Sequence, residues 1–135
     1  QLRLENYMFY QNNLSSNNQI VIHKLKNDTM NGAVSFPIFY SDRDKLYKFL
    51  ILNGWDVSKY FYRDCSSLKI FERFYVSCKN SIRACDEVIL LPVYPTYSRK
   101  SMEKNIKIIK KFFEKNNLNL WKLLLPAQVL HQYYV

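Results

Sequence analysis

The chain has 135 residues, of which 48% are hydrophobic and 16% aromatic. This composition excludes a disordered chain and is typical of one domain with a sizeable core. The only two glycines are Gly32 and Gly54, so the chain cannot form a glycine-rich phosphate loop of the GxGxxG or GxxxxGK[ST] type. A net charge of +9 permits an anionic partner. Because no zinc-finger, RNP or basic-region motif accompanies the charge, a solvated lysine-rich surface is favoured and nucleic acid is not.

The cysteines Cys65, Cys78 and Cys85 form an odd set without a CxxC pair. This pattern argues against a disulfide framework and a zinc site, and it favours reduced thiols in a cytoplasmic protein. We expect these thiols to be buried as small apolar side chains. No apolar run approaches the roughly 20 residues that a membrane helix needs, so no membrane span is expected. The chain begins at Gln1 and not at a methionine, which suggests a fragment of a longer protein.

In chain order, the first predicted element is a helix over Leu2–Leu14. Its members at helical spacing are Leu4, Tyr7, Met8, Gln11 and Leu14. Short strands are predicted over residues 19–25 and 34–40, and Pro37 within the second indicates an edge strand or an irregularity.

A second helix is predicted to begin at Ser41, whose hydroxyl can cap it while Asp44, three residues on, reaches back. Its apolar stripe consists of Leu46, Phe49, Leu50 and Ile51. Gly54 lies where a left-handed residue ends many helices.

The second half of the chain is predicted to contain an extended segment over residues 55–62, then a loop with a short helix over 64–75. A short helix over 77–85 and a buried strand over 87–93 follow. The last regular helix has a core face of Met102, Asn105, Ile106, Ile109, Phe112 and Phe113, with its lysines mainly outside. Asn116–Asn119 is predicted to end it, which gives a domain over residues 1–117 and an extension of uncertain structure over 118–135.

Two places along the chain carry candidate ligand-binding side chains. Tyr62 and Arg63 lie at the end of the extended segment, just before a loop, and together they can offer stacking and bidentate groups to an anionic or sugar ligand. The alternative interpretation is that Tyr62 belongs to a half-buried strand and that Arg63 pairs with Asp64 or another neighbour. Tyr94 stands between Pro92 and Pro95, which restrict its backbone. Such a residue suits the wall of a site or a packed turn.

Three motifs in fixed order resemble one known family. They are Phe36-Pro37-Ile38 ahead of Ser41–Leu46, then Leu52-Asn53-Gly54-Trp55, then Leu91-Pro92-Val93-Tyr94-Pro95. With Leu4–Tyr7 at the start, they resemble the C-terminal small domain of the DegT/DnrJ/EryC1/StrS family of pyridoxal-phosphate-dependent sugar aminotransferases. The resemblance covers residues 2 to about 116. Residues 62–68 depart from the commoner family pattern, which has a histidine-containing stretch there, and are similar to a divergent branch.

The resemblance implies an α+β fold in which a small antiparallel or mixed sheet packs against helices. It implies a C-terminal domain of a sugar-nucleotide aminotransferase that closes over the substrate and supports a homodimer. In the family a large domain, absent here, holds pyridoxal 5'-phosphate through a lysine, so this chain is expected to bind no cofactor and to be inactive alone. By position, the substrate-binding candidates are Tyr62, Arg63 and Tyr94; no catalytic, cofactor-binding or metal-binding residue is assigned.

A hypothesis from another class is a free-standing basic module that binds nucleic acid or an anionic partner. A third is a domain reused for dimerisation or as a scaffold.

Overall fold

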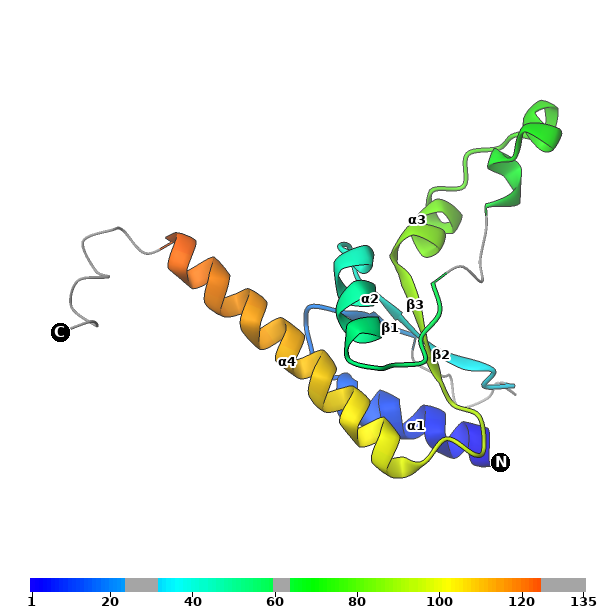
Figure 1. Ribbon diagram of the computed structural model, residues 1–135. Coiled ribbons are helices and arrows are strands. Elements are labelled where there is room, and N and C mark those ends of the chain that lie inside the picture. Colours follow the sequence, from blue (N-terminus) through cyan, green and yellow to red (C-terminus); the bar gives the residue numbers. More distant parts are fainter. Residues whose placement is uncertain (24–31, 60–63, 125–135) are drawn as a thin grey trace.

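The computed structural model describes residues 1–23, 32–59 and 64–124 (Figure 1). Its elements in chain order are α1 (Leu2–Leu14), β1 (Val21–Ile22), β2 (Ser35–Phe39), α2 (Arg43–Leu52), the 3₁₀ helices η1 (Cys65–Ser67) and η2 (Lys69–Phe74), α3 (Lys79–Glu87), β3 (Val88–Pro92) and α4 (Arg99–Leu124). The strands form one antiparallel sheet in the order β1-β2-β3. The predicted α+β class is therefore confirmed.

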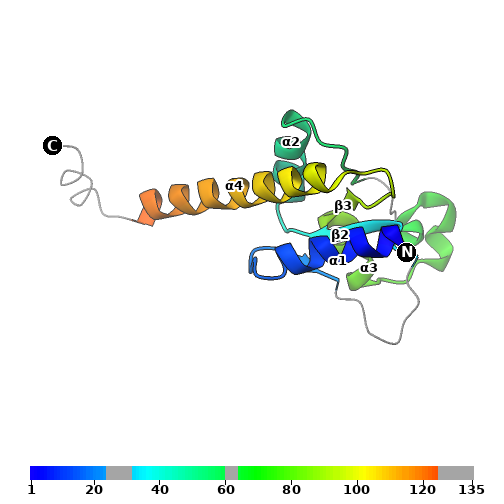
Figure 2. The ribbon, with the colours of Figure 1, turned by 90° about the horizontal axis from the view of Figure 1, so that it is seen from below.

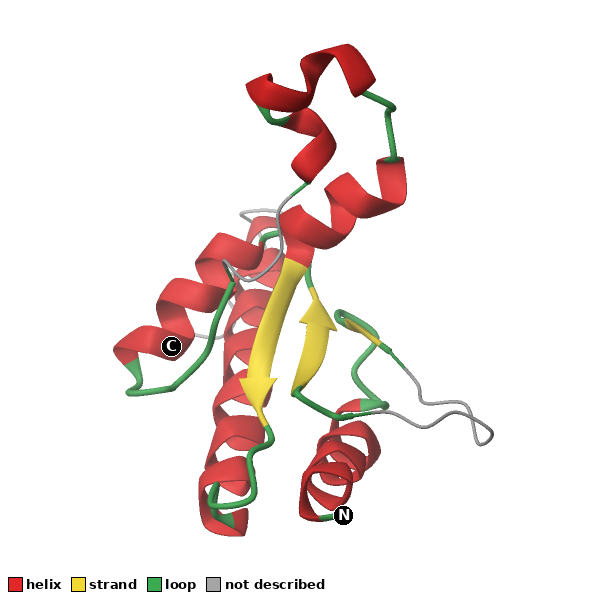
Figure 3. Cartoon of the chain, turned by 90° about the vertical axis from the view of Figure 1, so that its right-hand side faces the viewer, coloured by secondary structure: helices red, strands yellow, loops and turns green. Residues whose placement is uncertain are grey.

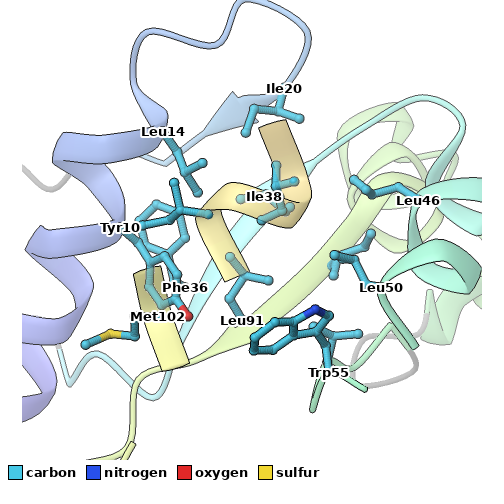
Figure 4. Packing of buried hydrophobic residues seen from close by; sticks show 14 of the residues in the cluster. Tyr10, Leu14, Ile20, Phe36, Ile38, Leu46, Leu50, Trp55, Leu91 and Met102 are labelled. Carbon is cyan, nitrogen blue, oxygen red and sulfur yellow. The ribbon is translucent and has the colours of Figure 1, made fainter. Parts of the chain in front are cut away.

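One face of the sheet carries the core. Phe36 and Ile38 of β2 and Ile89 and Leu91 of β3 point into it and are fully buried. Figure 3 shows the long helix behind these two strands, and Figures 1 and 2 show α1 and α4 side by side. Side chains of α1, α2 and α4 meet the strands in a single cluster (Figure 4). Burial of this apolar surface is the main force that holds the three helices against the sheet.

Pro37 lies in the central strand and not in an edge strand, yet its missing N–H leaves no gap in the ladder. Its partner in β3 is Leu90, which turns its own N–H and C=O toward Ser58 at 2.8 and 3.2 Å. On the other side, β1 pairs with β2 only at Ile38 and Phe39, so Pro37 lies beyond its end. Of the two predicted alternatives, an edge strand or an irregularity, the edge strand is wrong, because the proline needs only one unpaired position and not a whole unpaired strand.

Helix α1 has the predicted bounds, but its buried stripe is Tyr7, Tyr10 and Leu14. Tyr7 and Leu14 of the predicted stripe are buried, whereas Leu4 and Met8 are exposed and Tyr10 was not predicted. The two tyrosines can lie inside because their hydroxyls find partners there: that of Tyr7 donates to the carbonyl of His23 at 2.8 Å, and that of Tyr10 accepts from Asn105 at 2.8 Å. A pattern of apolar letters alone could not distinguish these two neighbouring stripes.

The start of α2 differs from the prediction. The helix begins at Arg43, its cap residue Asp42 makes no side-chain cap hydrogen bond, and Ser41 lies outside it. Asp44 does not reach back to the backbone, because its carboxylate binds Lys59 Nζ at 2.7 Å and Arg43 Nε at 3.1 Å. Two cations therefore hold the group that a capping box would have used.

The end of α2 is as predicted. Gly54 has a φ of +79°, and its N–H donates to the carbonyl of Ile51 at 2.9 Å. The next residue, Trp55, donates to the carbonyl of Leu50 at 3.3 Å, which completes a Schellman motif. Trp55 and Leu50 are both buried in the core cluster, so this turn returns the chain to the sheet.

Residues 64–78, which include η1 and η2, project away from the sheet (Figure 1) and are called the arm below. None of them is buried. Its large exposed apolar side chains are Leu68, Ile70, Phe71, Phe74, Tyr75 and Val76. Cys65 and Cys78 are exposed and Cys85 is half-buried. The prediction of buried cysteines is wrong because two of them lie on the arm.

Helix α4 buries the predicted face, with Met102, Asn105, Ile106, Ile109, Phe112 and Phe113 inside and its lysines up to Lys115 exposed. At its start, the hydroxyl of Ser98 accepts the N–H of Ser101 at 3.1 Å. The predicted end at Asn116–Asn119 is wrong, since the helix continues to Leu124. Asparagine is a moderate helix former, and no glycine or proline occurs between Pro95 and Pro126, so a propagating helix has no reason to stop there. No described helix is both long and apolar enough to cross a membrane.

Candidate functional site

A cavity of about 330 Å³ opens beside the last residues of β3. Its lining consists of Val34, Ser35, Asp56, Ser58, Leu90, Leu91, Pro92 and Tyr94. The walls are mainly apolar, with one carboxylate, one phenol and two hydroxyls among them. A concave apolar surface with a few polar groups is the usual form of a small-molecule site.

The carboxylate reaches this cavity because residues 55–59 run along the outer edge of β3. The two backbone hydrogen bonds between Ser58 and Leu90 hold this segment antiparallel to the strand. Trp55 and Val57 point into the core. Since alternate residues of an extended chain point to opposite sides, Asp56 and Ser58 face the cavity.

Tyr94 forms the opposite wall, and its backbone is held from two directions. The side-chain amide of Asn6 in α1 donates to the carbonyls of Val93 at 3.3 Å and of Tyr94 at 3.2 Å. The N–H of Tyr97 also donates to the carbonyl of Tyr94 at 2.9 Å, which closes a turn with Pro95 in its second position. The tyrosine between two prolines is therefore a fixed residue at the end of the strand.

The polar centre of the cavity is the contact between Tyr94 and Asp56. The Tyr94 hydroxyl donates to Oδ2 of Asp56 at 3.2 Å. Burial raises the pKa of the Tyr94 phenol above its ordinary value, and the adjacent Asp56 carboxylate raises it further. The phenol therefore stays neutral near pH 7 and acts as a donor beside a hydrogen-bond acceptor.

The cavity has no cationic side chain in its described lining. A carboxylate, a phenol and two serine hydroxyls can exchange hydrogen bonds with neutral hydroxyl groups, while the apolar walls accept carbon surface. A phosphate would face the Asp56 carboxylate without compensation. The arrangement fits a polyol or sugar ring better than an anion.

The predicted site residues fall in two places. Tyr94 lines the cavity, whereas Tyr62 and Arg63 lie outside the described residues. Asp56 and Ser58 also line the cavity and were not predicted as site residues. Their alternation with Trp55 and Val57 is visible in the sequence, but the strand along which they lie is more than 30 residues away.

Residues 1–110 match the DegT/DnrJ/EryC1/StrS aminotransferase family. The match begins in α1, includes the whole sheet and continues into α4, so it spans every element that builds the cavity. The chain belongs to this family. No curated protein matches the sequence.

Solved structures share the fold at low sequence identity. The sugar aminotransferase CalS13 from Micromonospora echinospora is 18% identical with a TM-score of 0.76, over 82% of this chain and 30% of that one. The aminotransferase TlmJ from Streptoalloteichus hindustanus is 18% identical with a TM-score of 0.77, over 85% and 32%. NtdA from Bacillus subtilis, with the bound cofactor PMP, is 18% identical with a TM-score of 0.66, over 81% and 27%. The chain thus spans less than a third of the length of these three proteins.

The described residues do not fit pyridoxal phosphate. The cofactor needs a lysine with an available amine and donors for its phosphate. Among the described residues up to Asn116, Lys59 is the one buried lysine, and its ammonium binds Asp44 at 2.7 Å and lies 4.8 Å from the centre of the Tyr47 ring. No cluster of three His, Cys, Asp or Glu side chains suitable for a metal occurs in the same ranges.

Proposed function

We propose that this chain is the C-terminal small domain of a pyridoxal-phosphate-dependent sugar-nucleotide aminotransferase. Residues 1–117 form the domain and residues 118–135 an extension. The proposal is supported by the family match over residues 1–110 and by the roughly threefold greater length of the solved structures that share the fold. The cofactor in NtdA supports pyridoxal phosphate as the cofactor of the longer protein.

The observation that carries the proposal is the Asp56–Tyr94 pair in the cavity beside β3. In this proposal the Asp56 carboxylate accepts a hydroxyl proton of the sugar, and the phenol oxygen of Tyr94, whose own proton is donated to Asp56, accepts another. The apolar walls exclude water and fix the orientation of the ring. These groups bind and orient the substrate; the lysine that bonds to the cofactor and the groups that hold its phosphate belong to the large domain.

Tyr62 and Arg63 complete the proposed substrate wall. They follow Ser58, which lines the cavity, by four and five residues. A guanidinium can bind two oxygens of one phosphate group, so Arg63 is assigned to the diphosphate of a nucleotide sugar and Tyr62 to stacking. In the assembled enzyme, two copies form a dimer and the small domain supports it. We assign the enzyme to the cytoplasm.

The test uses the longer reading frame that contains this chain. The longer protein is expected to retain pyridoxal phosphate, seen as visible absorbance, and to transfer an amino group to a keto-sugar nucleotide. The 135-residue chain alone is expected to do neither. Asp56→Asn should raise KM for the sugar nucleotide about tenfold, since a hydrogen bond to a charged group contributes about 1.5 kcal/mol or more. Tyr94→Phe should raise it about fivefold, since a hydrogen bond between neutral groups contributes about 1 kcal/mol.

Tyr75→Phe is the matched control, because Tyr75 is an exposed phenol on the arm. It should leave KM unchanged. A longer protein without cofactor would refute the proposal as a whole. Unchanged KM in both cavity variants would refute the role of the cavity alone.

A further inference from the structure

We propose that Asn105 is a positioning residue for Tyr94 and that it acts through Tyr97. As a statement about substrate binding, this inference rests on the proposed function. The contacts that carry it lie within the described chain, so they can be tested without the large domain.

Asn105 is a polar residue on the buried face of α4. Its side chain is 1% exposed, and Nδ2 donates to the hydroxyl of Tyr10 at 2.8 Å and to that of Tyr97 at 3.0 Å. Its Oδ1 has no hydrogen-bond partner among the described residues. An apolar side chain at this position would avoid the cost of burying that oxygen. A buried amide with this cost is understandable when it fixes the orientation of the groups that it binds.

Tyr97 transmits that orientation to the cavity. Its ring meets the ring of Tyr94 edge to face, with centroids 5.1 Å apart and planes at 69°. Because Asn105 holds the hydroxyl at the far end of Tyr97, the ring cannot swing away from Tyr94. Tyr94 is then held at its backbone by Asn6, at its ring by Tyr97 and at its hydroxyl by Asp56.

Tyr10 is the natural comparison, because the same amide also binds its hydroxyl. Its ring packs in the core against Phe36, with centroids 5.4 Å apart. Removing the Tyr10 hydroxyl takes one hydrogen bond from Asn105 and leaves the bond to Tyr97. Removing the amide takes both. The two changes therefore separate a loss of core stability from a loss of Tyr94 orientation.

The experiment compares Asn105→Leu with Tyr10→Phe in the 135-residue chain by NMR of labelled tyrosine rings. The pKa of Tyr94 is raised by its burial and by Asp56. In Asn105→Leu, Tyr94 leaves Asp56 part of the time, so its pKa should fall toward the ordinary value of about 10. In Tyr10→Phe the pKa of Tyr94 should stay unchanged even though the domain unfolds more easily.

A second readout is the set of ring-to-ring nuclear Overhauser contacts between Tyr94 and Tyr97, which should weaken in Asn105→Leu and persist in Tyr10→Phe. If Asn105→Leu does not fold, Tyr97→Phe takes its place, because it keeps the ring and removes only the bond to the amide. Unchanged ring contacts and an unchanged Tyr94 pKa would overturn the inference. A lowered Tyr94 pKa combined with an unchanged KM in the longer enzyme would sustain the positioning and refute the substrate role of Tyr94.

Discussion

The core and the arm both carry large apolar side chains, but these side chains differ in what they contact. In the core, Phe36 is fully buried and meets the rings of Tyr7 and Tyr10 at 4.7 and 5.4 Å. On the arm, Phe74 is 63% exposed, and its ring lies against the guanidinium of Arg73, 4.6 Å from the ring centre. We therefore expect the free energy of folding to come mainly from the contacts between the helices and the sheet, and the exposed arm to contribute little.

The two regions meet at a small group of charged residues. Lys59, at the end of the described segment that precedes the arm, is bound by Asp44 of α2 at 2.7 Å. Arg43, also in α2, donates to the carbonyl of Cys85 in α3, which follows the arm. The start of α2 therefore fastens the chain on both sides of the arm to the core.

The largest expected difference between the regions is in the loss of stability when a phenylalanine is truncated. Phe36→Ala removes a fully buried ring and should lower the free energy of unfolding by about 3–5 kcal/mol. Phe74→Ala should lower it by at most about 1 kcal/mol, because only an exposed cation–π contact is lost. Urea unfolding followed by circular dichroism measures both. Equal losses would mean that the arm is part of the cooperative core.

Much of this division was predictable from the sequence. The buried strand over residues 88–92 and the core face of α4 follow from runs and spacing of apolar residues, which burial directly selects. The start of α2 was not predictable, because its capping carboxylate is taken by Lys59 from a segment 15 residues away. The exposure of the arm was not predictable either, since its apolar letters are those of a core element.

The candidate site, too, was predictable only where a residue carries a local signal in the sequence. The prolines around Tyr94 marked it as a restrained residue, and the structure places it on the cavity wall. Asp56 carries no local signal of this kind, and it meets Tyr94 only because Ser58 pairs with Leu90. Asn105 was predicted on the core face, where its polar side chain is unusual. One of its tyrosine partners, Tyr97, lies eight residues before it, but the other, Tyr10, lies 95 residues away, so spacing could not reveal the pair.

The second prediction concerns the junction and its dependence on pH. The hydrogen bond from Lys59, and then that from Arg43, hold the pKa of Asp44 below its ordinary value. A carboxyl group whose pKa is lowered by folding stabilises the fold fully above its unfolded pKa of about 4, and this contribution is lost as the pH falls through the folded value. Asp44→Asn should therefore lower stability at pH 7, and the difference from the unchanged protein should vanish in acid.

The matched control is Glu87→Gln, which removes the surface pair with Arg83 within α3. It should lower stability by about 0.3–0.5 kcal/mol at pH 7, as an exposed helical pair does. The two variants are compared by urea unfolding at pH 7 and at pH values below 4. A loss in Asp44→Asn that persists unchanged in acid would show that the side chain acts by something other than its charge.

The smallest expected effect is a difference in thiol reactivity across the same junction. Cys78 is exposed at the end of the arm, whereas Cys85 is half-buried in α3. Burial raises the pKa of the Cys85 thiol, and the nearby Asp64 carboxylate adds to this, so less of the reactive thiolate is present. Iodoacetamide at pH 8 should modify Cys78 several times faster than Cys85, as measured by mass spectrometry of the peptides.

Because Arg43 fastens Cys85 to α2, Asp44→Asn should speed the reaction of Cys85 and leave that of Cys78 unchanged. Equal rates in the unchanged protein would mean that α3 opens together with the arm, which would move the boundary between the two regions to the start of β3.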